Sequence, residues 1–158
     1  MKRRLLAAFA VFIFVSPVLA AASYGNVMTP ISQFINGFNT GDTKSAFAAY
    51  AHGDILVIDE FAPHRWFGPN AAQDWAAAWD KHSQATGVTD ASVKFGKPTR
   101  TEIEDDVAYV IVPTVYLYKE HGKAMAEEGQ MTFVLHGEHA GWKISSWVWS
   151  GVTPHAGR

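Results

Sequence analysis

The sequence predicts an α+β fold in which three N-terminal helices pack on a curved antiparallel sheet. In residues 27–40 and 71–82, apolar side chains recur every three or four positions, which is the period of a helix face. From residue 91 onward, apolar and polar residues alternate, which is the period of a strand. Helices followed by a run of strands are typical of the α+β class.

Three helices are expected before the main strands. The first, residues 27–40, gathers five apolar side chains on one face: Val27, Ile31, Phe34, Ile35 and Phe38. Gly41 and Asp42 end this helix, and Asp42 is suited to cap a second one over residues 43–50. A third helix is expected over residues 71–82, where two tryptophans lie one turn apart.

The strands are expected in two groups. A short one covers residues 55–58, and a loop over residues 63–70 follows because Pro63 and Gly68-Pro69-Asn70 are turn signals. The longer strands are expected over residues 92–104 with an interruption at Pro98, and then over residues 107–119, 124–135 and 142–150. The tail from residue 152 to residue 158 is expected to be loose.

The first 20 residues have the order of a secretory signal peptide. Three basic residues at positions 2–4 precede an apolar run over residues 5–15, and Pro17 and small residues follow. Cleavage after Ala20 is favoured, with Ala22 as the alternative, and an uncleaved membrane anchor is the competing interpretation. We therefore expect a protein that is exported, either periplasmic or secreted, and that has no membrane attachment after cleavage.

The composition limits which classes of molecule the protein can bind. The full chain has 13 basic and 15 acidic residues, which give a net charge of −2. Three of the basic residues would be lost with the signal peptide, and the net charge would then be −5. No basic patch remains, which argues against a nucleic-acid partner. The chain has no cysteine, so an apolar core rather than disulfides must hold the fold together. Its 6 Trp, 10 Phe and 5 Tyr supply large side chains for that core.

An acid pair follows the short strand. Asp59 and Glu60 come directly after residues 55–58, and alternation places Asp59 on the buried side with Ile55 and Val57. A buried carboxylate is costly unless it has partners or a function. Asp59 is either a functional acid in a pocket or a residue that caps the following turn by accepting backbone N–H bonds.

The segment from Tyr50 to Gly68, together with the helix that ends in Asn39-Thr40-Gly41-Asp42, resembles the nuclear transport factor 2-like superfamily. This superfamily includes steroid delta-isomerase, scytalone dehydratase and the SnoaL-like polyketide cyclases. The resemblance covers residues 27–151 and implies a cone-shaped fold with an apolar pocket, a small hydrophobic ligand and frequent dimerisation.

The resemblance also implies a role for Asp59. In the steroid isomerases the general base is an Asp nine residues before a loop glycine, and Asp59 precedes Gly68 by nine. The other two isomerase groups do not carry over, because the tyrosine position falls on Phe34 and the second aspartate falls near Met131. Neither side chain donates a hydrogen bond to an enolate, which argues against steroid isomerisation.

Strand parity predicts the pocket interior. Thr114, Tyr116 and Tyr118 share one strand face, and the resemblance places this face in the pocket with Met131 and Phe133. The alternative is that these side chains only fill the core. Buried Tyr hydroxyls need hydrogen-bond partners, and Asp59 is one candidate.

Cationic and aromatic residues alternate in the predicted loop after the acid pair. His64, Arg65 and Trp66 are expected at the pocket mouth, where His64 and Arg65 would bind an anionic group; the alternative is a surface loop anchored by Trp66. Glu60 is expected in solvent or paired with Arg65. His82 is expected either as a favourable charge at the end of its helix or at the pocket rim.

A homodimer is predicted from the last strand. If Ile144, Ser146 and Val148 face the pocket, Trp147 and Trp149 lie on the outer sheet face, where such an apolar patch usually contacts a partner.

No metal site or cofactor is predicted. The His136–His139 segment falls in an expected turn, and the sequence contains no phosphate loop, dinucleotide fingerprint or nucleophile elbow. Three functions remain: an enzyme that transfers protons on a small hydrophobic molecule with Asp59 as base, a non-catalytic binding protein, and an interaction domain.

Overall fold

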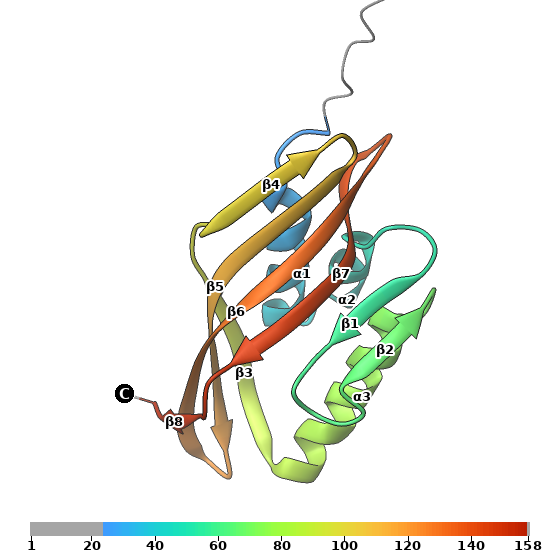
Figure 1. Cartoon of the computed structure of the whole chain (residues 1–158). Coiled ribbons are helices and arrows are strands. Elements are labelled where there is room, and N and C mark those ends of the chain that lie inside the picture. Colours follow the sequence, from blue (N-terminus) through green and yellow to red (C-terminus); the bar gives the residue numbers. More distant parts are fainter. Residues whose placement is uncertain (1–23, 158) are drawn as a thin grey trace, which may run out of the picture.

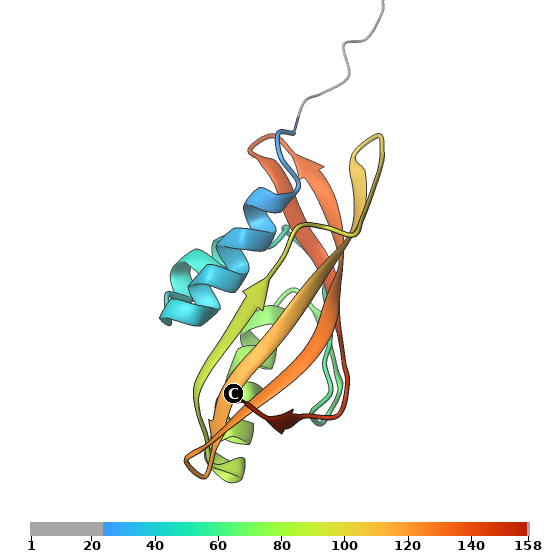
Figure 2. The ribbon, with the colours of Figure 1, turned by 90° about the vertical axis from the view of Figure 1, so that its left-hand side faces the viewer.

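The computed structural model describes residues 24–157, and the expected signal peptide lies outside them. The helices are α1 (Met28–Thr40), α2 (Thr43–Ala48) and α3 (Ala71–Thr86). The strands are β1 (Ile55–Ile58), β2 (Arg65–Gly68), β3 (Val88–Phe95), β4 (Arg100–Glu104), β5 (Val107–Glu120), β6 (Lys123–Glu138), β7 (Gly141–Gly151) and β8 (His155–Ala156). The fold is α+β, with the helices on one side of a curved, unclosed sheet (Figures 1 and 2).

The sheet is mixed, so the expectation of a purely antiparallel sheet is wrong. The strand order is β2-β1-β7-β6-β5-β3, with β4 paired to β5 and β8 paired to β6. β1 and β7 run parallel, with Val57 opposite Trp147, while the other strand pairs are antiparallel. Most of the chain separates β1 from β7, so no hairpin turn imposes the antiparallel direction on them.

The helices also differ in detail from the expectation. β1 precedes α3 as expected, but the unexpected β2 does so as well, so two strands of the sheet come before the last helix. α1 ends at Gly41, whose φ of 71° is left-handed, and the Asp42 side chain accepts a hydrogen bond from the Ser45 backbone N–H at 3.0 Å. α3 continues to Thr86 and stops at Gly87, which has a φ of 70°.

The predicted loop contains a strand. Residues 65–68 form β2, which pairs with β1 so that Ile58 lies opposite Arg65 and Ile55 opposite Gly68. Trp66 is buried while Arg65 and Phe67 are exposed, which is the alternation of an edge strand. This strand was not predicted, because it has only four residues and turn-forming residues lie on both sides of it.

A β-bulge reverses the side-chain pattern of β7. Val134 lies opposite Ser146 and Leu135 opposite Ile144, so Ser145 has no opposite residue, and its hydroxyl donates to the Val134 carbonyl at 3.0 Å. Ile144 and Trp147 are therefore both buried, although strict alternation would place them on opposite faces. The expectation that Trp147 and Trp149 occupy the outer face is wrong.

The core lies between the helices and the inner face of the sheet. α1 contributes Ile31 and Ile35, and the central strands contribute side chains such as Val110, Phe133 and Leu135. Each such side chain stabilises the fold by about 1.5–3 kcal/mol relative to exposure. Burial of this kind holds a chain that has no disulfide.

The C-terminal tail is not loose as expected. β8 pairs with β6, with Ala156 opposite Met125 and His155 opposite Ala126.

Within residues 24–157 no helix is long and apolar enough to cross a membrane.

The close contact between α1 and α2 yields a stability prediction. A Cβ at Gly37 would lie 2.8 Å from the Ala46 backbone nitrogen and 2.9 Å from the Asp42 carbonyl oxygen. We expect Gly37→Ala to destabilise the fold by about 1–3 kcal/mol in urea denaturation, because backbone atoms must move. Asn36→Ala, at an exposed neighbouring position, is the control. An equally stable Gly37→Ala protein, explained by the higher helix propensity of Ala, would contradict this account.

Candidate functional site

A pocket opens between α1, α3 and the inner face of the sheet, with an empty volume of about 620 Å³ that includes its mouth. Its walls are mainly aromatic and include Phe34, Phe38, Trp75, Trp79, Trp147 and Trp149. Its polar lining comes from Asp59, Glu60, His82 and Tyr116. An aromatic cavity with a few convergent polar groups is typical of a small-molecule site.

The aromatic walls support one another. Trp147 lies 5.0 Å from Trp75, with ring planes at 88°, and 5.6 Å from Phe34. Phe38 meets the Trp79 ring at 5.2 Å and 79°. Edge-to-face pairs of this kind are worth about 0.5–1.5 kcal/mol each beyond their burial. The shape of the pocket is thus set by rings that already have partners.

Asp59 faces the pocket from the end of β1. The Trp75 indole N–H donates to one carboxylate oxygen at 2.8 Å, and the Glu60 backbone N–H donates to the other at 2.7 Å. Burial raises the pKa of Asp59 to about 6, although both hydrogen bonds act in the opposite direction. This carboxyl group therefore exchanges protons closer to neutral pH than an ordinary Asp does.

The turn between β1 and β2 positions this acid. The Asp59 backbone N–H donates to the His64 carbonyl at 3.1 Å, and the His64 N–H donates to the Phe61 carbonyl at 2.8 Å. Phe61 is buried, and its ring stacks on His82 at 4.9 Å. His82 thereby lies at the pocket wall rather than acting only as a charge at the end of α3.

A second acidic centre joins Glu60 to Glu127. The Trp149 indole N–H lies 3.1 Å from a Glu60 carboxylate oxygen and 3.2 Å from one of Glu127. The two carboxyl groups thus share one donor and lie close to each other. Burial and the neighbouring Glu60 raise the pKa of Glu127 to about 8, and only 1% of this residue is exposed. No ion pair joins Glu60 to Arg65 among the described residues.

Tyr116 stands across the pocket from these acids on β5. Burial raises the pKa of this tyrosine above its ordinary value, although the neighbouring Trp79 side chain acts in the opposite direction. Its ring stacks on Tyr118 at 4.7 Å. Tyr116 therefore stays protonated and keeps its O–H proton as a donor at physiological pH.

The structure brings together some of the residues that the sequence indicated. Asp59, Phe34, Tyr116 and Met131 line the pocket. Phe133 is fully buried in the core, and Tyr118 lies behind Tyr116. Thr114 faces inward, but its buried hydroxyl has no hydrogen-bond partner among the described residues.

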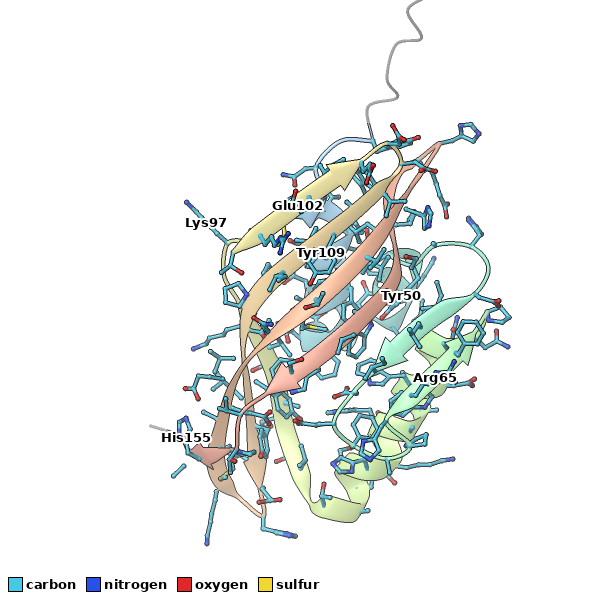
Figure 3. All side chains as sticks on the ribbon, in the orientation of Figure 1. Tyr50, Arg65, Lys97, Glu102, Tyr109 and His155 are labelled. Atoms are coloured by element: carbon cyan, nitrogen blue, oxygen red, sulfur yellow. The ribbon has the colours of Figure 1, made fainter. Side chains whose placement is uncertain are left out.

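The three residues expected at the pocket mouth lie apart. The exposed Arg65 side chain extends from β2 over the Phe67 ring at 5.2 Å, away from the pocket lining (Figure 3). Trp66 is buried and packs on Phe61 at 5.1 Å. His64 is exposed, and its ring nitrogen lies 3.3 Å from the Asp59 carbonyl oxygen.

Sequence reasoning missed Glu127 and the inward position of Trp149. Glu127 shares the strand parity of Met131 and Phe133, so the same count that placed those residues inside would have found it. The inward position of Trp149 could not be predicted, because no sequence pattern marks the bulge at Ser145.

Within residues 24–157 no group of three or more His, Asp or Glu side chains is arranged to hold a metal ion.

The buried carboxyl of Glu127 yields a pH prediction. An unperturbed Glu side chain has a pKa of 4.5, whereas Glu127 in the folded chain has a pKa of about 8. Between these two pH values, the folded chain keeps a proton that the unfolded chain has lost. Stability should therefore fall as pH rises between these two values. Glu127→Gln should abolish this loss and raise stability by more than about 1 kcal/mol at about pH 9, with urea denaturation as the measurement.

Glu128→Gln is the matched control, because this exposed neighbour has its pKa lowered by a hydrogen bond from His155. That variant should gain no stability at high pH. A Glu127→Gln protein with the pH profile of the wild type would contradict the assignment of a protonated Glu127.

The fold is that of several solved proteins of low sequence identity. A ketosteroid isomerase-like protein from Erwinia carotovora atroseptica has a TM-score of 0.61 at 17% identity, over 80% of this chain and 94% of its own. Hexachlorocyclohexane dehydrochlorinase LinA-type3 from Novosphingobium barchaimii has a TM-score of 0.67 at 17% identity, over 84% and 89%. The type 2 enzyme has a TM-score of 0.70 at 13% identity, over 84% and 86%.

Curated proteins give no sequence match. The model of the SnoaL-like domain matches residues 27–154, which is most of the chain. This match agrees with the structural neighbours and with the resemblance to the nuclear transport factor 2-like superfamily. The chain belongs to the SnoaL-like domain family.

Proposed function

We propose that the pocket binds a small, largely apolar molecule and that Asp59 removes a proton from it as a general base. The observation that carries this proposal is the Asp59 carboxylate at the wall of an aromatic pocket, with its pKa raised to about 6. General bases work best when their pKa lies near the operating pH. Isomerase, lyase and cyclase reactions all include such a step.

The environment of Asp59 leaves room for this role. Each carboxylate oxygen accepts one hydrogen bond, from Trp75 or from the Glu60 backbone, and an ionised carboxylate has about four acceptor sites in total. Tyr116 supplies a donor that could stabilise negative charge on a bound carbonyl oxygen, since its raised pKa keeps the hydroxyl protonated. Asp59 and Tyr116 thus form an acid–base arrangement suited to proton abstraction next to a carbonyl group.

The structural neighbours support the same reaction class. A ketosteroid isomerase-like protein and two dehydrochlorinases share the fold. The pocket walls at Phe34 and Met131 still argue against steroid isomerisation, because neither side chain donates a hydrogen bond. Proton transfer on a different apolar substrate is the function that fits these residues.

A non-catalytic ligand-binding protein is the second candidate. It is favoured by the same two hydrogen bonds, because Trp75 and the Glu60 N–H fix Asp59 as a capping residue would be fixed. In this alternative the aromatic walls alone retain the ligand.

Export is part of the proposal. The order of basic, apolar and small residues over positions 1–20 supports a signal peptide, and we propose a periplasmic or secreted location. Removal of the leader would release a domain that begins near α1.

Deuterium exchange tests Asp59. Apolar carbonyl compounds that raise the melting temperature of the mature protein are incubated with it in D₂O, and exchange at the carbon next to the carbonyl is followed by NMR. Asp59→Asn should slow the protein-dependent exchange by about 10²–10⁴-fold while ligand binding remains. Asp74→Asn, an exposed position on α3, is the control and should leave the exchange unchanged. Ligand binding by the wild type without any exchange would favour the non-catalytic candidate.

We also propose a homodimer through the outer sheet face, now on different residues. Outward-facing apolar side chains on four strands include Leu56, Ile58, Ile111, Val134 and Val148, each half-buried in the single chain. A continuous apolar surface on these strands would favour a second copy over water.

Sedimentation of the mature protein at about 10 μM tests the dimer, which at a dissociation constant near 1 μM would be largely formed. Val148→Glu should shift the mass towards a monomer because it places a charge on the proposed interface. Gln73→Glu adds the same charge on the exposed side of α3 and should leave the dimer intact. A wild-type protein of monomer mass would refute the dimer.

A further inference from the structure

We infer that the pocket selects a ligand whose apolar body carries a positively charged group, such as an amine or a quaternary ammonium. The group would lie against the tryptophan faces, beside the carboxyl groups of Asp59 and Glu60. This inference rests on the proposed small-molecule pocket and names the chemical class of its ligand.

The tryptophan walls offer ring faces more than N–H donors. Three of the four indole N–H groups already have acceptors: Trp75 donates to Asp59, Trp147 to Tyr50 at 2.8 Å, and Trp149 to Glu60 and Glu127. The fourth tryptophan, Trp79, lies beside Tyr116. The remaining exposed parts of the first three rings are their π faces and carbon edges. A ring face attracts a cation and, among aromatic side chains, indole does so most strongly.

The charges of the pocket have one sign. Asp59 and Glu60 line it, and the Trp149 indole N–H joins Glu60 to a third acid, Glu127. Among the described residues no Lys or Arg lines the pocket. The two basic side chains nearby are His82, stacked on Phe61 in the wall, and the exposed His64, which contacts the Asp59 backbone.

Several of the described cations are engaged elsewhere. Lys119 pairs with Asp90 at 2.8 Å, Arg100 pairs with Glu102 at 3.3 Å, and Lys143 donates to the Ala48 carbonyl. Among residues 24–157 neither Asp59 nor Glu60 forms an ion pair with a basic side chain. Buried charges without a counter-charge are costly, so a cationic ligand would gain more here than a neutral one of the same shape. An anionic ligand would be repelled.

The raised pKa of Glu127 adds a distinct signature. A cation bound beside Glu60 and Trp149 would lower the pKa of Glu127, so binding should release a proton to the solvent. A neutral ligand of equal size gives no such release.

Three probes that share a benzyl group test the inference on the mature protein: benzyltrimethylammonium, its isosteric neutral carbon analogue neopentylbenzene, and the anion phenylacetate. Binding is measured by thermal shift and by NMR of the tryptophan indole N–H signals, which locates the probe. The cation should bind at least about tenfold more tightly than the neutral analogue, and the anion more weakly than both. Calorimetry in two buffers of different protonation enthalpy should detect proton release for the cation alone.

The variant Glu60→Gln should remove most of the preference for the cation while leaving the neutral probe unaffected, and Glu128→Gln should change neither. Equal binding of the cation and the neutral analogue would overturn the cationic class but leave the apolar pocket of the proposed function standing. Failure of all three probes to shift the pocket indole signals would overturn both.

Discussion

The pocket depends on one residue without an opposite partner. Because Ser145 bulges from the pairing of β6 with β7, the remainder of the last strand turns its aromatic side chains towards the helices. Trp147 then reaches Phe34, Trp75 and the Tyr50 hydroxyl, which ties α1, α3, the segment after α2 and the sheet to a single ring. In a regular ladder, Trp147 and Trp149 would lie on the outer face and the pocket would lack its back wall.

The same region that gives the pocket its shape weakens the fold electrostatically. Asp59 and Glu127 are both held where burial raises their pKa values, which means that ionising either group costs the folded chain stability. The surrounding core of fully buried side chains offsets this cost. Titratable groups kept in unfavourable surroundings inside a cavity are typical of functional sites.

Sequence reasoning reached the fold class, most strands and the inward position of Asp59, because these follow from local periodicity and from short turns. It failed where long-range pairing decides. The parallel contact of β1 with β7 and the bulge at Ser145 depend on strands far apart in the chain, and β2 is too short to show a period. Strand parity alone would have placed Glu127 inside, but the isomerase groups of the resembled superfamily have no counterpart at this position.

Gly151 has a place in this arrangement that its position at the end of β7 does not suggest. A methyl group there would lie 1.5 Å from a carboxylate oxygen of Glu127 and 2.8 Å from the Trp149 indole nitrogen. The Glu127 side chain on β6 therefore fills the space that a side chain at position 151 on β7 would need. In the course of sequence divergence the two positions should change together: relatives with a larger residue at 151 should carry a smaller one at 127, and with it a pocket of different charge.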